Sequence, residues 1–321
     1  MTGGPRPLRI FLVGYSGVHN VGDEAIRAAI LAAAPRLGAE VVAIATHDPA
    51  DPDPRAVPVR GRGLWRYLRA IMRCDRVVLG GGGILKDEGL RMPLELFATA
   101  LGARVLRRDV ALVAVGVGPF YSRTGRWLAR ATARLARIRT VRDAASASAL
   151  EGLGVRRVVL GADPTFSFGA PPSVPADAPP ATSRRLAISL RRWFLKVDDG
   201  ATRQAALREA VAAAVAAPIA EGWSSRLVSC YWPRDLAEMR ALAADPRLGA
   251  ADVVERELDW PALGAAVRDA DLVVAMRYHA VAAAAMLGRP TIAVAYEPKV
   301  RALAAELGLP IVDVDDPALA R

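Results

Sequence analysis

The chain has 321 residues, which is enough for two domains of about 150 residues each. Its 53% hydrophobic and 24% charged residues exclude general disorder. Two cysteines, Cys74 and Cys230, are too few for a disulfide framework or a four-cysteine zinc site. The apolar run at residues 10–13 is too short for a secretory signal, and no stretch approaches the roughly 20 apolar residues that cross a bilayer. These features predict a soluble, cytoplasmic protein.

The net charge of +10 comes from 43 basic and 33 acidic residues, and all but three of the basic residues are arginine. The exceptions are Lys86, Lys196 and Lys299. The skew toward arginine, beside many alanines and prolines, indicates biased coding composition rather than selection for a polyanion. Along the sequence the arginines are scattered, with no basic stripe interleaved with aromatic residues. We therefore expect no nucleic-acid partner.

The first half of the chain alternates short β-branched apolar runs with longer helical segments. We predict strands at 8–13, 40–45, 76–79, 110–115, 139–141 and 158–160, and helices at 23–34, 64–72, 93–107, 125–136 and 144–152. Strands that are apolar almost throughout are typical of a parallel sheet covered on both faces. The alternation of strand and helix predicts a doubly wound α/β domain spanning residues 1–168.

Residues 169–182 contain five of the 23 prolines and have no helical or strand periodicity, which is typical of a linker. The alternation then resumes in residues 183–321. We predict strands at 186–190, 226–230, 252–255, 272–275 and 291–295, and helices at 201–221, 236–244, 261–269, 281–287 and 300–307. The prediction is two tandem Rossmann-like domains with a cleft between them, and a C-terminal tail that could cross back onto the first domain. In such sheets ligands bind beyond the carboxyl ends of the strands.

The first predicted strand runs into a glycine-rich turn directly before a helix. The turn and the start of the helix contain Gly14, Gly17, Asn20, Gly22 and Asp23. Glycines allow close approach to a ligand, and a helix N-terminus offers free N–H groups to an anion. Asp23 is alternatively the N-cap of that helix. The spacing matches neither a dinucleotide fingerprint nor a Walker A loop, so a ligand loop and a structural turn both stay open.

The predicted third strand ends in four consecutive glycines, followed by Lys86 and Asp87. Such a run is entropically costly, and close approach of the backbone to a ligand or to the facing domain would justify it. We therefore take Gly81, Gly82 and Gly83 as candidate binding residues, with a flexible turn as the alternative.

In the second half, candidate residues again follow predicted strands. Arg191 follows the first strand, where a guanidinium suits a carboxylate or phosphate, although a surface arginine is the simpler interpretation. Arg277 and His279 follow the strand at 272–275, and His279 could transfer protons or serve only to cap a helix. Glu297 and Lys299 follow the next strand. No set of histidines, cysteines and carboxylates has metal-ligand spacing, so we expect no metal.

Several blocks occur in a characteristic order along the chain: GYSGVHNVGDEAI, GGGGILKDE, VGVGP, VRDAASASALEGLGV with ADPTF, MRYHAVAAAAMLGRP and YEPKVRALAAELG. Together they resemble the polysaccharide pyruvyl transferase family, which includes bacterial cell-wall enzymes, over residues 8–310. The resemblance implies a glycosyltransferase-B-type fold. It also implies transfer of pyruvate from phosphoenolpyruvate onto two hydroxyls of a sugar, which forms a cyclic ketal and releases phosphate. No further cofactor is implied.

The resemblance also assigns expected roles. The family's Arg-x-His element matches Arg277 and His279, and its cleft arginine matches Arg191. With Lys299, the two arginines would bind the anionic donor on the C-terminal side, and the N-terminal domain would bind the acceptor. His279 would transfer a proton, with Asp23 or Glu297 as its partner. The family often has Asp-Pro-Lys where this chain has Glu297-Pro298-Lys299, and often glutamine in place of Lys86.

The acceptor would be a sugar, a nucleotide-sugar or a lipid-linked glycan, and peripheral association with the inner face of the plasma membrane is compatible with the last of these. Two other functions stay open. A nucleotide-sugar-dependent glycosyltransferase would use the same architecture and also bind phosphates. A non-catalytic protein that binds anionic glycans is the third alternative, against which the presence of both Arg277 and His279 argues.

Overall fold

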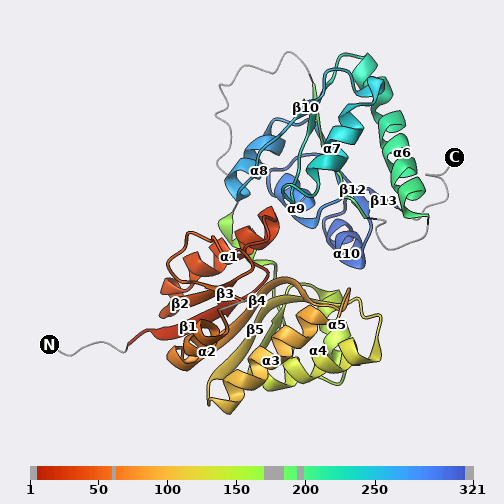
Figure 1. Ribbon diagram of the computed structural model, residues 1–321. Coiled ribbons are helices and arrows are strands. Elements are labelled where there is room, and N and C mark those ends of the chain that lie inside the picture. The colour runs from red at the N-terminus through yellow and green to blue at the C-terminus, as the bar shows by residue number, and fades with distance from the viewer. Residues whose placement is uncertain (1–5, 60–62, 170–183, 194–198, 315–321) are drawn as a thin grey trace. The chain divides into compact units, whose positions relative to one another are not determined.

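The computed structural model describes residues 6–59, 63–169, 184–193 and 199–314. Its residues divide into two units, shown in Figure 1. The first unit comprises residues 1–18 and 23–168, and the second comprises residues 19–22 and 169–321. The short segment His19–Gly22 therefore groups with the second unit, although the chain on both sides of it belongs to the first.

The first unit contains a parallel sheet of seven strands in the order β3-β2-β1-β4-β5-β6-β7. The strands are β1 (Leu8–Val13), β2 (Ala39–Thr46), β3 (Ala56–Pro58), β4 (Arg76–Leu85), β5 (Asp109–Val117), β6 (Ile138–Val141) and β7 (Val159–Leu160). The helices are α1 (Val21–Ala33), α2 (Leu64–Arg73), α3 (Arg91–Val105), α4 (Arg123–Leu135) and α5 (Ala144–Gly152). The order reverses between β1 and β4, as in a doubly wound fold.

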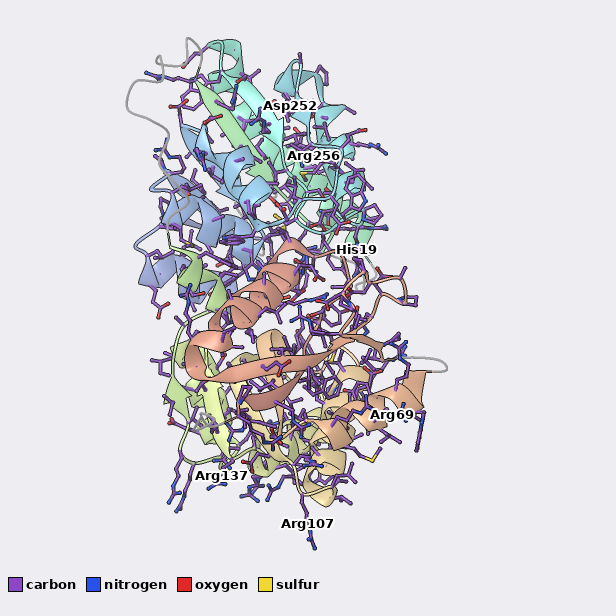
Figure 2. The ribbon with its side chains drawn as sticks, turned by 90° about the vertical axis from the view of Figure 1, so that its left-hand side faces the viewer. His19, Arg69, Arg107, Arg137, Asp252 and Arg256 are labelled. Carbon is purple, nitrogen blue, oxygen red and sulfur yellow. The ribbon has the colours of Figure 1, made fainter. Side chains whose placement is uncertain are left out.

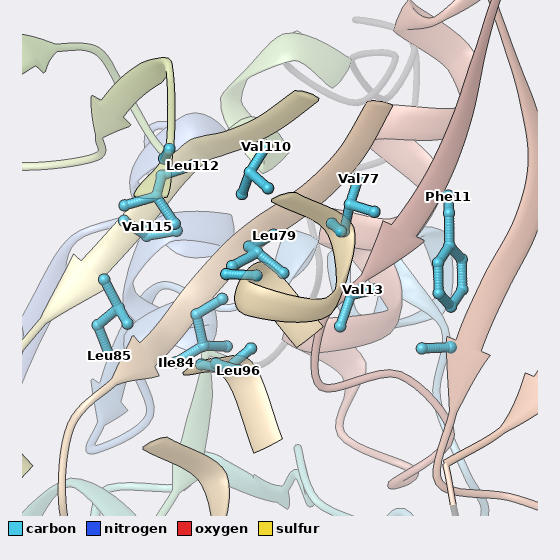
Figure 3. Close-up of a cluster of buried hydrophobic side chains, with 14 of the residues drawn as sticks. Phe11, Val13, Val77, Leu79, Ile84, Leu85, Leu96, Val110, Leu112 and Val115 are labelled. Carbon is cyan, nitrogen blue, oxygen red and sulfur yellow. The ribbon is translucent and has the colours of Figure 1, made fainter. Parts of the chain in front are cut away.

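Two clusters of buried side chains hold the helices of this unit to its sheet. The larger one joins the strands to α2, α3, α4 and α5, and it includes Phe11, Leu79, Leu96 and Leu112, which are shown in Figure 3. The smaller one packs α1 against the sheet through residues such as Ile30. Two clusters are needed because the strands carry apolar side chains toward both faces, as the sequence predicts.

The four glycines do not form a loop after a strand, because β4 continues through them to Leu85. Gly80 pairs with Val113 and Gly82 with Val115 of β5. Gly81 and Gly82 have φ of 69° and 71°, which favours glycine. A Cβ on Gly81 would overlap Cγ2 of Ile26 in α1. The run therefore lets α1 approach the sheet closely, a contact that the sequence did not predict.

The second unit contains a parallel sheet of six strands in the order β10-β9-β8-β11-β12-β13. The strands are β8 (Arg185–Ser189), β9 (Ser224–Leu227), β10 (Asp252–Val253), β11 (Leu272–Ala275), β12 (Thr291–Ala295) and β13 (Ile311–Asp313). The helices are α6 (Gly200–Ala220), α7 (Leu236–Ala243), α8 (Trp260–Arg268), α9 (Tyr278–Met286) and α10 (Pro298–Glu306). Short 3-10 turns at Pro35–Leu37, Pro164–Phe168 and Pro246–Leu248 complete the regular structure. Here the order reverses between β8 and β11.

Several boundaries differ from the predicted ones. The strand predicted at 226–230 ends at Leu227, because the chain then turns and Cys230 accepts a hydrogen bond from the backbone of Val21 instead. The strand predicted at 252–255 ends at Val253. The short strands β3 and β13 were not predicted, since three residues are too few to reveal an alternating hydrophobic pattern. The predicted linker and the end of the tail lie almost wholly outside the described residues.

Candidate functional site

The central strands of the second sheet bring the candidate residues of that unit to one edge. Ser189 of β8, Ala275 of β11 and Ala293 of β12 lie side by side in register. Because these neighbouring strands run parallel, the residues that follow them lie at the same edge. Arg191 follows β8, Arg277 follows β11, and Lys299 opens α10 after β12. This edge is also where the strand order reverses, the usual binding position in such sheets.

Arg191 lies against two aromatic rings that also contact each other. Its guanidinium carbon is 4.5 Å from the ring centre of Tyr296 and 5.0 Å from that of Trp193. The two rings contact each other edge to face, with centres 4.8 Å apart. Among the described residues, the buried Nε of Arg191 has no hydrogen-bond partner. The arginine is thus fixed by stacking while part of its donor capacity is unused.

Glu297 joins the two cations of this site. Its carboxylate contacts the Lys299 ammonium and lies 3.7 Å from Nη1 of Arg191. The Glu297 side chain is only 4% exposed, against 14% for Arg191 and 24% for Lys299. A single buried carboxylate therefore holds an arginine and a lysine together. We call Arg191, Tyr296, Glu297 and Lys299 the cation cluster.

The pKa of Tyr296 reports the electrostatic character of this cluster. Burial of the phenol raises its pKa, but the nearby charges of Lys299 and Arg191 oppose that effect, and the net result is a pKa below its ordinary value. A buried tyrosine normally has a raised pKa, because the phenolate is desolvated. The lowered value therefore indicates a positive potential at this edge of the sheet, which suits an anionic ligand.

Arg277 is oriented by a carboxylate that the sequence did not suggest. Its Nε and Nη2 donate to the two oxygens of Asp235 at 2.7 and 2.6 Å, and both side chains are buried. Burial alone would lower the pKa of Arg277, but Asp235 outweighs it and the pKa is raised. The guanidinium also lies over the ring of Tyr231, 5.3 Å from its centre. Nη1 of Arg277 takes no part in the hydrogen bonds to Asp235.

His279 lies in the first turn of α9, partly buried between aromatic and backbone groups. Its ring centre is 5.1 Å from that of Tyr278 and 6.3 Å from that of Trp260, edge to face in both cases. The backbone of Gly22 lies against its other side, and a Cβ on Gly22 would overlap the imidazole, closest to Nδ1. The histidine thus contacts two aromatic rings and the backbone of a glycine.

The segment His19–Gly22 is attached to the second unit by its own hydrogen bonds. Val21 N donates to Cys230 O at 3.0 Å, and Trp232 N donates to His19 O at 2.9 Å. Nδ1 of His19 lies 3.1 Å from a carboxylate oxygen of Glu257. Asn20 Oδ1 accepts from Gly22 N, which is the position of an N-cap. Asn20 is therefore the N-cap of α1, and Asp23, which the sequence offered as the alternative N-cap, lies in the first turn of the helix instead.

The candidate residues of the first unit have mostly structural contacts. A Cβ on Gly14 would lie 2.8 Å from Gly80 O, and one on Gly17 would overlap Thr46. Asp87 is buried and accepts hydrogen bonds from Tyr121 N, Ser122 N and Ser122 Oγ, so it fixes the turn before α4.

The other candidates of this unit are the glycines of β4 and Lys86. A Cβ on Gly82 would lie 3.0 Å from Oδ1 of Asp23, whereas a Cβ on Gly83 would have the most space of the four glycines. Lys86 forms an ion pair with Glu88 at 2.6 Å.

Three contributors were not predicted from the sequence. Trp193 and Tyr296 are the two rings that contact the Arg191 guanidinium. Trp193 comes two residues after Arg191 and Tyr296 directly precedes Glu297, so their places next to candidate residues could have indicated that they belong to the site. Asp235 offered none, because it lies 42 residues from Arg277 in an ordinary polar turn.

Within the described ranges, no three His, Cys, Asp or Glu side chains are grouped so that they could bind a metal ion. In those same ranges, no helix combines the length and the apolar character needed to span a bilayer.

The family model for polysaccharide pyruvyl transferase matches residues 20–298, which is most of the chain. The matched region includes Arg277, His279 and three members of the cation cluster, and it ends one residue before the fourth member, Lys299. No curated protein matches the chain in sequence.

Solved structures with the same fold include sugar-nucleotide enzymes. A UDP-GlcNAc 2-epimerase from Methanocaldococcus jannaschii, in complex with UDP-GlcNAc and UDP, has a TM-score of 0.65 at 12% identity, covering 98% of this chain and 91% of its own. The UDP-GlcNAc 2-epimerase from Neisseria meningitidis bound to UDP-GlcNAc has a TM-score of 0.62 at 13% identity, and the match covers 98% of this chain and 90% of the epimerase. A glycosyltransferase from Rickettsia africae has a TM-score of 0.61 at 11% identity, and the match covers 98% of this chain and 87% of the glycosyltransferase. The chain therefore has the fold of two Rossmann-like domains of the glycosyltransferase-B type.

Proposed function

Because the chain belongs to the polysaccharide pyruvyl transferase family, we propose that it transfers pyruvate from phosphoenolpyruvate onto two hydroxyls of one sugar. The product would be a cyclic ketal, and phosphate would be released. The acceptor would be a cell-surface polysaccharide or its nucleotide-sugar or lipid-linked precursor. No further cofactor is needed for this chemistry.

The cation cluster is the observation that carries the proposal. Phosphoenolpyruvate has a carboxylate and a phosphate on three carbons, so its site must supply several positive groups close together. Arg191 and Lys299 are held together by the single carboxylate of Glu297, and the lowered pKa of Tyr296 indicates that their charge is only partly neutralised. An incoming anion would compete with Glu297 for both cations, and Arg277 would add a guanidinium that Asp235 orients.

The proton transfers of the reaction suit His279. A proton must reach the methylene carbon, one sugar oxygen must bond to C2, the C2–O bond to phosphate must break, and the second oxygen must then bond to C2. One hydroxyl proton balances the new C–H bond and the other leaves with phosphate. A neutral imidazole can accept a hydroxyl proton and later donate it. Asp23 and Glu297 are the candidate partners of His279 in these transfers.

The test incubates the full chain with phosphoenolpyruvate and a panel of UDP-sugars, GDP-sugars and lipid-linked glycans. Phosphate release and an acceptor enlarged by a ketal-linked pyruvate are expected. Release of a nucleoside diphosphate without use of phosphoenolpyruvate would instead identify a glycosyltransferase.

Donor binding is tested separately by calorimetry, since it needs no acceptor. Arg191→Ala should weaken the binding of phosphoenolpyruvate, because it removes a cation that is stacked and nearly buried. Arg192→Ala is the matched control, because Arg192 is the exposed neighbour. Equal effects of the two substitutions, or no binding by the unaltered chain, would contradict the proposal.

A further inference from the structure

The outer surface of three helices in the first unit exposes many large apolar side chains. The helices α2, α3 and α4 lie next to one another over the sheet (Figure 1). Tyr67 of α2 is hydrogen-bonded to Thr99 of α3, and Phe97 of α3 contacts Trp127 of α4 with ring centres 5.3 Å apart. The exposed apolar side chains of these helices are Leu64, Trp65, Leu68, Met72, Leu94, Leu101, Val105 and Trp127. We call this surface the α2–α4 face.

The sequence of α2 divides the helix into three sectors. At 100° per residue, one sector holds the buried Ala70 and Ile71, which pack on the sheet. The neighbouring sector holds the exposed apolar residues Leu64, Trp65, Leu68 and Met72, and Trp65 is 64% exposed. The third sector holds Arg66, Arg69 and Arg73. The apolar sector is not needed for the core, because a separate sector of the same helix already faces the sheet.

Positive charge accompanies the apolar side chains. Neither α2 nor α4 contains an acidic residue, whereas α4 has arginines at positions 123, 126, 130 and 134, all exposed. Among the residues that the structure describes, Arg69, Arg73 and Arg126 have no ion pair. Figure 2 shows the side chains of Arg69 and Arg107 extending away from the first unit. Arginines that look scattered in the sequence therefore gather on one face once the helical period is applied.

We propose that the α2–α4 face binds the surface of an anionic lipid bilayer. An exposed apolar stripe with tryptophan, bordered by arginine, is the pattern by which a helix lies in the interface between headgroups and acyl chains. Arginines add attraction to anionic headgroups, and tryptophan favours the same interfacial depth. A nucleic acid would use the arginines but leave the leucines, Met72 and Val105 exposed. A symmetric contact with a second copy would place arginines against arginines.

The test is flotation of the full chain with lipid vesicles, in the absence of phosphoenolpyruvate and of any acceptor. The chain should float with vesicles that contain phosphatidylglycerol, should not float with phosphatidylcholine alone, and should be released by salt. Because no pyruvyl transfer is measured, the result is independent of the proposed function.

Two double variants separate the apolar and basic contributions. Trp65→Glu with Leu68→Glu should abolish flotation, since it puts charge where side chains would insert. Arg69→Gln with Arg73→Gln should lower partitioning about fivefold for each arginine. Leu37→Glu is the matched control, because Leu37 is 81% exposed in the turn that follows α1. It should float like the unaltered chain, and circular dichroism should show all variants folded.

Three results would overturn the proposal. They are failure of the unaltered chain to float with anionic vesicles, flotation that persists in the Trp65/Leu68 variant, and an equal loss in the Leu37 variant. Binding to duplex DNA that the Arg69/Arg73 variant loses, without vesicle binding, would identify a nucleic-acid surface instead.

Discussion

The backbone of Gly22 lies directly against the imidazole of His279, so that no side chain fits at position 22 without displacing the ring. Gly22 comes from the segment 19–22 that is hydrogen-bonded to Cys230 and Trp232. Gly22 and the histidine of the Arg-x-His element are therefore in contact within the second unit, although residues 23–168 of the first unit and most of the second unit separate them along the chain.

Gly22→Ala should displace His279 and lower turnover. A shift of about 1 Å at a catalytic group can cost about 10²-fold in rate. Steady-state kinetics of the variant measure this loss, and its crystal structure would show the ring moved. Gly89→Ala is the control, because no atom lies within 4 Å of a Cβ at that position. Unchanged kinetics of Gly22→Ala would mean that the position of the imidazole is not important.

His279→Ala should lower turnover about 10²- to 10⁴-fold, the usual contribution of a positioned proton-transfer group. The thermal midpoint should change little, since the ring is only partly buried. His47→Ala, which removes a histidine that contacts Tyr15 in the first unit, should leave turnover unchanged. Turnover of His279→Ala at the level of the unaltered chain would refute the assigned role.

Asp235→Ala should destabilise the fold strongly, because it leaves the buried guanidinium of Arg277 without its carboxylate. Breaking a buried pair in this way costs about 3–5 kcal/mol. Urea unfolding monitored by circular dichroism measures the loss. Glu255→Ala removes one partner of the exposed pair between Arg240 and Glu255 and should cost less than about 1 kcal/mol. A similar small cost for both variants would show that Asp235 is not needed to hold Arg277.

The sequence predicts the parts of the site that follow strands, because parallel strands end at one sheet edge. Arg191, Glu297 and Lys299 were identified on that ground and do lie together. Asp235 could not be identified from the sequence, since its approach to Arg277 depends on the path of the chain after β9. The glycine run was noticed, but its packing against α1 was not predicted, and its role in binding stays a prediction. Its partner Ile26 lies on another element, and only the packing of α1 shows why the glycines are needed.

The phenol of Tyr296 should titrate below its ordinary pKa near 10, because Lys299 and Arg191 outweigh the effect of burial. The absorbance difference between the unaltered chain and Tyr296→Phe isolates this titration. The folded state loses the proton at lower pH than the unfolded state does. In the interval between the two pKa values the unfolded state therefore binds more protons, so the stability that this group contributes rises with pH.

Ligands and substitutions at the cation cluster should move that titration in a defined direction. Phosphoenolpyruvate would neutralise the cations and raise the midpoint, and Lys299→Gln should raise it in the free chain. A midpoint that neither change moves would mean that the two cations do not act on Tyr296.

Gly81→Ala should destabilise the first unit, whereas Gly83→Ala should be tolerated. At position 81 a methyl group would overlap Ile26, and φ of 69° adds strain that a non-glycine residue must bear. Overpacking and such backbone strain each cost about 1–3 kcal/mol. At position 83 the nearest atom is Nη2 of Arg142 at 3.8 Å, and φ is not in the left-handed region. Urea unfolding compares the two variants. If Gly83→Ala proves the more damaging, the glycine run serves something other than the close approach of α1, and its role as a binding surface would again be the better explanation.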